Sequence, residues 1–438
     1  MNKKEEAAVF WFRRDLRLKD NRGLFHALRS GYPVLPVFIF DTDILGRLEE
    51  KADIRVSFII AALEELNKQL IASGSSLKIC HGTPSEEFRK ITEEYEIKAV
   101  FTNTDYEPYA TQRDLRIGVM LTNAGIPMHS FKDQVIFEKG EVVKADGTPY
   151  TVFTPYSRVW KKQLTAKDIE HLPSENLTGS FVKRKPSRVP APEELGFTAA
   201  GSVSAVPVIS EEIIRNYHLT RDIPSLEGTT KLGVHLRFGT VSIRRLVSTA
   251  LRLSETWLNE LIWREFFMGI LWHFPHVIDH SFKRKYDAIL WRNNEQEFEK
   301  WCTGMTGYPI VDAGMRELNE TGFMHNRVRM ITASFLTKHL LTDWRWGEAY
   351  FAGKLLDHEL SSNNGNWQWA AGTGCDAAPY FRVFNPSEQT RRYDPQMIYV
   401  KRWVPELNGP SYPAPVVDHA TARQRALTTY SSGLGRGD

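Results

Sequence analysis

The sequence predicts an α/β N-terminal domain with a doubly wound, Rossmann-like parallel sheet, followed by an all-α C-terminal domain. Short apolar runs alternate with helical stretches over the first 130 residues, and a helical period dominates from about residue 207 onward. Between them lies a stretch rich in Pro, Gly, Ser and charge, which is typical of a linker. We therefore expect the α/β domain over residues 1–131, the linker over 132–205 and the helical domain over 206–438.

Four short apolar runs predict the strands of the sheet. They cover residues 9–12, 34–40, 77–80 and 99–102. Residues 54–71 carry apolar side chains at helical spacing between the second and third runs. Buried strands that alternate with helices pair in parallel, because the crossover helix returns the chain to the end of the sheet where the previous strand began. No Gly-x-Gly-x-x-Gly follows the first run, so a standard dinucleotide-binding turn is not indicated.

The second half of the chain predicts helices. Apolar residues recur at helical spacing over 256–274, 324–341 and 346–360. Beyond Pro410 this pattern is lost, so we expect an irregular tail whose last residues, 431–438, fray. Ten of the 12 tryptophans lie after residue 250. Filling a core does not require that bias, because Leu and Ile fill space without an indole N–H to satisfy.

Composition is that of a globular protein and argues against several classes. The 438 residues include 42% hydrophobic and 25% charged residues, and they contain no run of about 18 apolar residues that would span a membrane. The first residues lack the apolar run of a secretory signal, so we expect a cytoplasmic protein. Three scattered cysteines predict neither a disulfide framework nor a metal centre. The net charge of +3 excludes a generally basic nucleic-acid coat but allows one basic face.

Glu260 and Trp263 form the first candidate functional pair. On a helix they share one face, since they are three positions apart. A carboxylate beside an exposed indole can stack an extruded base and hydrogen-bond its edge. The spacing by itself is more typical of a core tryptophan beside a solvated glutamate.

Polar groups gather in three further segments. Asn326 and Met330 share a helix face, while Arg327 and Arg329 are expected to point elsewhere. Residues 357–365 place Ser, Asn and Gly where a helix breaks, which suits a ligand with many hydrogen-bonding edges. The turn at 227–232 can hold phosphates through hydroxyls and backbone amides. Ordinary turns and a helix with surface arginines would look similar.

Three tryptophans of the second half also allow two interpretations. Trp291, Trp344 and Trp367 could relay electrons or simply fill a core.

Longer motifs resemble the DNA photolyase/cryptochrome family. Residues 367–386, WQWAAGTGCDAAPYFRVFNP, are similar to the family's signature almost throughout, and so are residues 306–316 and 11–17. The resemblance covers nearly the whole chain and is strongest to bacterial class I cyclobutane pyrimidine dimer photolyases. It implies an α/β antenna domain and a helical domain that holds a U-shaped FAD, in agreement with the predicted fold.

The resemblance also implies which residues act on the flavin. Arg329 and Asp357 would form an ion pair beside the isoalloxazine ring, and Asn363 would face its N5 atom. Further contacts to FAD would come from Tyr217, Thr229, Thr230, Lys231, Leu232, Gly233, Asn326 and Glu359. Trp367, Trp344 and Trp291 would be the inner, middle and outer members of an electron relay.

A second implied set of residues acts on DNA. The lesion pocket would be lined by Glu260, Trp263, Asn326, Met330 and Trp369, and DNA phosphates would be held by Arg221, Arg327 and Arg382. Glu260, Trp263 and Asn363 would carry the catalysis.

The sequence departs from the family pattern in two places. Gly233 stands where a serine usually contacts the FAD diphosphate, so a backbone N–H would have to serve. Tyr109 and Ala110 replace the Asn-Glu pair of folate-binding members. A second, antenna chromophore would therefore be a deazaflavin or a flavin rather than a folate.

The implied activity is light-driven repair of cyclobutane pyrimidine dimers by electron transfer from reduced FAD to the flipped-out lesion. Its partner would be UV-damaged DNA, single- or double-stranded, with no membrane, and the enzyme would be a monomer of the bacterial cytosol or nucleoid. The main alternative is a cryptochrome, a blue-light photoreceptor without repair, although such members often have a long extension and little follows Trp403. Repair of the (6-4) photoproduct usually needs paired histidines where this chain has His325 and Asn326. A flavin-binding interaction protein without photochemistry is the third alternative.

Overall fold

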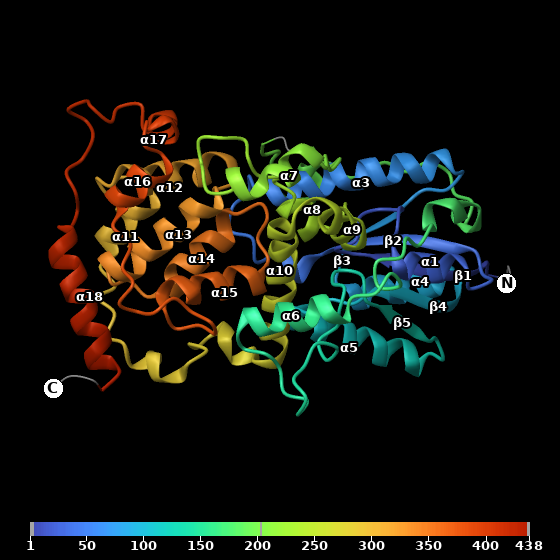
Figure 1. The fold of residues 1–438 in the computed structure, drawn as a ribbon. Coiled ribbons are helices and arrows are strands. Elements are labelled where there is room, and N and C mark those ends of the chain that lie inside the picture. Colours follow the sequence, from blue (N-terminus) through green and yellow to red (C-terminus); the bar gives the residue numbers. More distant parts are fainter. Residues whose placement is uncertain (1–3, 202–203, 436–438) are drawn as a thin grey trace. The chain divides into compact units, whose positions relative to one another are not determined.

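The chain forms two compact units in the computed structural model, which describes residues 4–201 and 204–435 (Figure 1). Unit 1 comprises Met1–Glu141, Lys162–Ile209 and Lys231–Arg252, and unit 2 comprises Val142–Lys161, Ser210–Thr230 and Leu253–Asp438. Each unit therefore gathers three stretches of the chain. The predicted linker is divided between the units, and residues 231–252 of the predicted helical domain belong to the α/β unit.

Unit 1 is built on a five-stranded parallel sheet, as predicted. Its strands, in the order β3-β2-β1-β4-β5, are β1 (Glu6–Phe12), β2 (Val34–Asp41), β3 (Lys78–Gly82), β4 (Glu96–Asn103) and β5 (Met128–Phe131). Strands β1 and β2 are buried almost throughout, which explains why they read as continuous apolar runs. Strand β5 has partly exposed residues and therefore carries no apolar run that predicts it.

Helices connect these strands (Figure 1). They are α1 (Arg22–Leu28), α2 (Thr42–Leu45), α3 (Ile54–Ala72), α4 (Pro84–Glu94) and α5 (Pro108–Asn123). The side chains of Asn21, Asp53 and Thr83 cap α1, α3 and α4 by accepting first-turn N–H groups. In the sheet, β2 lies on one side of β1 and β4 lies on the other, so the direction in which strands are added reverses at β1. Parallel sheets bind ligands in the crevice beyond the strand ends at such a reversal.

Buried ion pairs explain why residues 231–252 belong to unit 1. This stretch contains α8 (Gly233–Arg237) and most of α9 (Ile243–Leu253). Arg244 is buried and lies 3.0 Å from Asp20 and 2.9 Å from Asp133, while Arg17 also pairs with Asp133 at 2.6 Å. Removing one partner of such a set leaves an uncompensated buried charge. Asp133, from the predicted linker, is thus part of the core of unit 1, and Val182 of the same linker donates its N–H to the Val34 carbonyl (2.9 Å).

Unit 2 is built from helices. They are α6 (Phe153–Gln163, mostly in this unit), α7 (Glu211–Thr220), α10 (Glu255–His273), α11 (Glu295–Cys302), α12 (Pro309–Thr321), α13 (Asn326–Ser334), α14 (Trp344–Lys354), α15 (Leu360–Ala371), α16 (Pro386–Tyr393), α17 (Ile398–Trp403) and α18 (His419–Gly433). Short helical turns connect some of them: η3 (Pro275–Ile278), η4 (Arg284–Ala288) and η5 (Phe335–His339). Among the described residues, the structure has no helix with the length and apolar character needed to cross a membrane.

The predicted helix boundaries differ from the observed ones in three places. The stretch 324–341 is α13 followed by the π-helical turn η5, and the stretch 346–360 is interrupted by a break at 355–359. The expectation of an irregular tail is wrong, because α18 buries Ala422, Ala426 and Tyr430 at helical spacing. Residues 431–433, expected to fray, end this helix, and residues 436–438 lie outside the described part of the chain.

Candidate functional site

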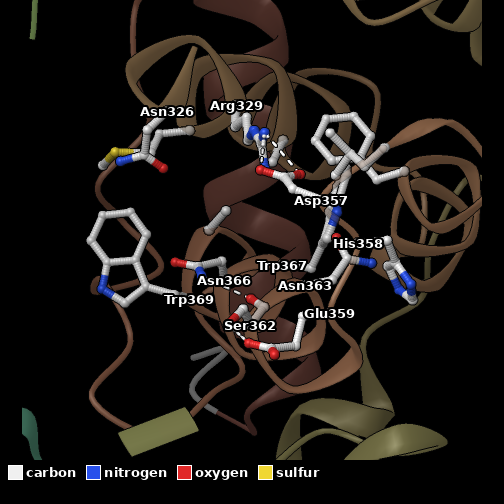
Figure 2. A pocket seen from close by; sticks show the side chains of 15 residues that line it. Asn326, Arg329, Asp357, His358, Glu359, Ser362, Asn363, Asn366, Trp367 and Trp369 are labelled. Atoms are coloured by element: carbon white, nitrogen blue, oxygen red, sulfur yellow. Dashed lines mark hydrogen bonds and ion pairs between the residues drawn. The ribbon is translucent and has the colours of Figure 1, made fainter. Parts of the chain in front are cut away.

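A pocket opens in unit 2 between α13, the end of α14 and α15 (Figure 2). Helix α13 lines it with Asn326, Arg329, Met330 and Ala333, and helix α15 with Ser362, Asn363, Asn366, Trp367, Trp369 and Ala370. The other lining residues come from the end of α14 and the break that follows it: Phe351, Leu355, Asp357, His358 and Glu359. The pocket thus has apolar and aromatic walls with a few polar groups directed into it.

Arg329 and Asp357 form an ion pair at the edge of this pocket (Figure 2). The Arg329 Nη2 atom lies 3.1 and 3.0 Å from the two Asp357 oxygens, and Arg329 Nε donates to the Met324 carbonyl at 2.7 Å. The expectation that Arg329 points away from the face of Asn326 and Met330 is wrong. Residues three positions apart share a helix face just as residues four apart do, and Arg329 follows Asn326 by three.

Asn363 is oriented by Glu348 of α14. The Asn363 Nδ2 atom donates to the Glu348 carbonyl (3.0 Å) and to Glu348 Oε1 (2.9 Å). Because the NH₂ group is engaged twice, Oδ1 is the amide atom offered to a ligand in the pocket. Burial raises the pKa of Glu348, although the hydrogen bond from Asn363 lowers it. Sequence analysis missed Glu348, since no motif surrounds it.

Glu359 is held by two neighbours beside the pocket. Its Oε1 atom accepts from Arg264 Nη2 of α10 at 2.9 Å. Its Oε2 atom accepts from the Ser362 hydroxyl at 3.2 Å (Figure 2). The ion pair connects α10 with the beginning of α15. Arg264 is a second residue that sequence analysis did not single out.

The three tryptophans expected to form a relay belong to one apolar cluster. Trp367 and Trp344 are 2% and 1% exposed, while Trp291 is partly buried against the same cluster. Gly347 makes room for the inner ring, because a Cβ atom there would overlap the Trp367 indole. Exposure thus increases from Trp367 and Trp344 to Trp291, as a path toward the surface requires.

Asn326, Met330 and Trp369 of the implied lesion site line this pocket, whereas Glu260 and Trp263 of α10 are not among its lining residues. Glu260 Oε1 accepts from Arg221 Nη1 at 2.6 Å. Burial raises the pKa of Glu260, and Arg221 opposes this shift.

The three arginines implied for DNA phosphates have different surroundings. Arg221 is paired with Glu260. Arg327 Nη2 donates to Asp222 at 2.7 Å, and its guanidinium lies over the Tyr393 ring. Arg382 is exposed and lies over the Phe384 ring, 5.5 Å from its centroid. A guanidinium that already pairs with a carboxylate has fewer N–H groups for a phosphate, so Arg382 is the best placed of the three.

The turn implied for the FAD phosphates contains the border between the units. Tyr217, Thr229 and Thr230 belong to unit 2, and Lys231, Leu232 and Gly233 belong to unit 1. Within unit 2, the Thr220 hydroxyl donates to the Gly228 carbonyl at 2.9 Å, which holds the beginning of the turn against α7. Burial and the nearby Glu260 raise the pKa of Tyr217. The contacts of all six residues to FAD stay predictions.

Unit 1 has a cavity of its own, of about 160 Å³, beyond the carboxyl ends of its central strands. The charged residues that line it are Arg13, Arg14, Asp41, Asp105, Glu107, Arg113 and Arg237. The Tyr109 hydroxyl donates to Asp41 at 2.7 Å, and the guanidinium of Arg113 lies 4.9 Å from the Trp11 ring centroid. Flat rings and guanidinium groups together suit a planar aromatic ligand with polar edges.

The residues of the unit 2 pocket fit the ring system of FAD. A flat heterocycle needs apolar walls and a few polar groups at its edge. Phe351, Leu355 and Ala370 provide apolar surface, and Asn363 Oδ1 and the pair of Arg329 and Asp357 provide the polar groups.

Comparisons with known proteins agree with this geometry. A family model described as "DNA photolyase" matches residues 8–176, and one described as "FAD binding domain of DNA photolyase" matches residues 257–411. A deoxyribodipyrimidine photo-lyase from Halobacterium salinarum is 36% identical over 98% of this chain and 99% of the relative. The enzyme of the same name from Escherichia coli is 35% identical over 97% of this chain and 98% of the relative.

Solved structures share the fold, which confirms the predicted fold class. A bacterial class III photolyase from Agrobacterium tumefaciens has a TM-score of 0.88 at 31% identity and covers 99% of this chain and 98% of its own. An archaeal photolyase from Sulfolobus tokodaii, solved with two FAD molecules, has a TM-score of 0.84 at 35% identity over 98% of this chain and 100% of its own. A Synechocystis cryptochrome has a TM-score of 0.83 at 25% identity over 98% and 100%.

Proposed function

The chain belongs to the DNA photolyase family, and on that premise we propose how its residues divide the work of repair. The enzyme uses FAD and light to split cyclobutane pyrimidine dimers in UV-damaged DNA. When bound, reduced FAD would supply the light absorption and the single electron needed to split the dimer, and Asn363, Arg329 and Asp357 would hold its ring system. The protein binds, orients and shields the reacting partners.

The observation that carries the flavin assignment is the double engagement of the Asn363 NH₂ group by Glu348. An amide held in this way keeps its oxygen available to accept a hydrogen bond from the N–H of a reduced flavin. The carboxylate of Asp357 fixes the Arg329 guanidinium, which would hold the edge of the flavin ring. Trp367, Trp344 and Trp291 conduct single electrons from the surface to this site.

Damaged DNA is recognised from α10 and α13. Trp263 stacks on the extruded base, and the Glu260 carboxyl hydrogen-bonds the base edge with its orientation held by Arg221. Asn326, Met330 and Trp369 shape the part of the site next to the flavin. Arg382 and Arg327, with Arg221, hold the phosphates, so binding weakens as the salt concentration rises. Base flipping costs least at a damaged, poorly paired site, which contributes to selectivity.

One assay separates repair from the function of a cryptochrome, a photoreceptor without repair. Purified, reduced protein is incubated with a dimer-containing oligonucleotide under blue light and in the dark. Repair predicts loss of dimers only in the light. If the dimers persist under illumination while the flavin is photochemically active, the chain is a photoreceptor.

The cavity of unit 1 is the place for an antenna chromophore. Tyr109, with its hydroxyl on Asp41, and the guanidinium of Arg113 favour a deazaflavin or a second flavin over a folate. The Sulfolobus tokodaii relative, which holds two FAD molecules, supports this choice. Fluorescence excitation spectra of protein mixed with FMN, FAD or a reduced folate test it. Energy transfer from the folate in preference to the flavins would contradict it.

We also infer a monomer that acts on single- or double-stranded DNA in the bacterial cytosol or nucleoid. Its relatives from Halobacterium salinarum and Escherichia coli are both named deoxyribodipyrimidine photo-lyase, which supports action on DNA. Light scattering of the purified holoenzyme measures its mass, and repair assays on both forms of DNA measure its strand preference.

A further inference from the structure

The Phe153 ring covers part of the Trp263 indole. Their centroids are 3.7 Å apart, and the ring planes lie within 4° of parallel. Phe153 is buried whereas Trp263 is only half-buried, so part of the indole remains accessible. A flat ring held against another ring gains stacking energy and loses rotamer freedom.

The segment that carries Phe153 is anchored to α10 along its length. Trp160 Nε1 donates to Glu265 Oε1 at 2.6 Å, and Lys161 pairs with Glu255 at 2.6 Å. These contacts, about two turns beyond Phe153, keep α6 beside α10. They also explain why residues 142–161, from the predicted linker, belong to unit 2.

Phe153 is held at its backbone as well. Its N–H donates to Asp376 Oδ2 at 3.0 Å. Asp376 lies in the 367–386 motif and has a φ angle of 41°, a left-handed conformation that a residue with a side chain seldom adopts. Such a conformation persists where the surroundings determine it, so the position of the Phe153 ring is fixed from α6 and from this turn.

The other neighbours of Trp263 connect it with the flavin-site helix. Phe267 lies one turn along α10, with its ring centroid 5.4 Å from that of Trp263. A Cβ atom on Gly365 of α15 would overlap the Phe267 ring. The indole is thus placed by aromatic contacts that extend from α6 to α15.

We propose that Phe153 is a positioning residue for damage recognition, because its stacking holds the Trp263 indole in the orientation onto which the extruded base stacks. The inference rests on the assignment of Trp263 to lesion binding in the proposed function. A base that meets a preordered ring does not have to immobilise it. Ordering one side chain on binding weakens affinity by about two- to tenfold, and Phe153 removes this cost.

The test compares the binding of two duplexes to the holoenzyme in the dark, one with a single dimer and one undamaged but of the same sequence. Phe153→Leu removes the ring, and we expect affinity for the damaged duplex to fall by about two- to tenfold. Affinity for the undamaged duplex, flavin content and the rate of flavin photoreduction stay at wild-type values. Phe153→Tyr keeps the ring and restores damage binding.

Tyr156→Leu is the matched control. Tyr156 lies on the same helix and its ring packs on Phe266 with a centroid distance of 5.2 Å. We expect this variant to discriminate between the two duplexes as the wild type does. If it loses discrimination as much as Phe153→Leu, the effect belongs to the docking of α6 and the proposal is wrong.

A double-mutant cycle separates this inference from the proposed function. In a Trp263→Ala background, Phe153→Leu should have no further effect on damage binding. A full additional loss would show that Phe153 does not act through Trp263. If Trp263→Ala itself binds the damaged duplex like the wild type, the assignment of Trp263 to lesion binding is wrong, and so is the role proposed for Phe153. Phe153→Met, which keeps side-chain volume without the ring, repeats the test should the Leu variant lose its flavin.

Discussion

In the proposed flavin site, Glu348 determines which atom of Asn363 would face the flavin, and we therefore expect it to influence the flavin potential. In Glu348→Gln, the new NH₂ group can donate to Asn363 Oδ1 and turn the amide around. Losing one hydrogen bond of about 1 kcal/mol to the reduced flavin corresponds to about 40 mV for one electron. We expect the one-electron midpoint potential to fall by that amount in spectroelectrochemical titration.

A control for this prediction is Glu317→Gln. Glu317 is also buried in unit 2 and accepts from the Tyr399 hydroxyl at 2.6 Å, but it does not line the pocket. This variant should leave the potential unchanged. A Glu348→Gln potential equal to that of the wild type would mean that the backbone carbonyl of residue 348 suffices to hold the amide.

In the proposed lesion site, loss of the Glu260 carboxyl has two opposing effects on DNA binding. Glu260→Ala removes the group that hydrogen-bonds the lesion and releases the Arg221 guanidinium for a phosphate. We expect the quantum yield of repair to fall several-fold while affinity for damaged DNA changes little. The yield is measured as dimers split per photon absorbed. A variant that repairs like the wild type would remove Glu260 from the catalytic site.

In the proposed relay, Trp367, which lines the pocket, is the first member of the electron path. Trp367→Phe should slow photoreduction of oxidised FAD at least tenfold, because phenylalanine is much harder to oxidise than tryptophan. Repair by enzyme that was chemically reduced beforehand should stay near wild type. Absorption spectra during illumination with an external reductant measure the first effect. Equal photoreduction in both proteins would exclude Trp367 from the path.

At the scale of helices, α14 and α15 pack closely because Gly347 lacks a side chain. Gly347→Ala would place a Cβ atom against the Trp367 ring and near the Leu336 side chain. Overpacking of this kind typically costs about 1–3 kcal/mol. We expect a lower free energy of unfolding and slower photoreduction. Gly353→Ala on the same helix, where a Cβ atom would meet open space, should show neither effect.

The π-helical turn η5 shows where helical periodicity misleads. The apolar pattern continues through residues 335–341, so one helix is predicted there, but the wider turn buries Lys338 and His339. Because lysine is rarely buried, the sequence alone favours a surface position for Lys338. Burial lowers the pKa of Lys338 to about 7, and its ammonium donates to the Tyr380 carbonyl at 3.0 Å. Tyr430 of α18 and Tyr380 of the 367–386 motif contribute to this environment, and neither contact can be anticipated from the local pattern.

The site itself could be predicted in part. Arg329, Asp357 and Asn363 stand in the polar segments 326–330 and 357–365, which the resemblance to the family assigns to the flavin, and the structure brings them to one pocket. Glu348 and Phe153 could not be found in that way. Each acts on a residue of another helix, and a lone glutamate or phenylalanine carries no local signal of its partner.

At the scale of the whole molecule, buried histidines oppose folding in acid. Burial lowers the pKa of His235 and His325 to about 4 and that of His339 to about 3. Between pH 6.5 and these values, the unfolded chain binds protons that the folded chain does not, so each histidine lowers the free energy of unfolding as the pH falls. The loss is about 2 kcal/mol for each at pH 5. His339→Asn should flatten the pH dependence measured by denaturant titration at pH 7.5 and 5.0.

The exposed His218 provides the comparison for this prediction. His218→Asn should leave the pH dependence of unfolding as it is in the wild type. If His339→Asn and the wild type lose the same stability between pH 7.5 and 5.0, protonation of His339 does not contribute to acid unfolding.

The interleaving of the two units has a consequence for biosynthesis. Asp20 and Asp133 of the α/β unit obtain their Arg244 partner only from the stretch Lys231–Arg252, which follows α6 and α7 of the helical unit. A nascent chain leaves the ribosome from its N-terminus. The sheet can therefore form early, but its buried charges remain incompletely neutralised until residue 252 has emerged. A fragment that ends at residue 131 or 205 would be released without that arginine, so we expect such fragments to be captured by chaperones or proteases instead of accumulating as a free antenna domain.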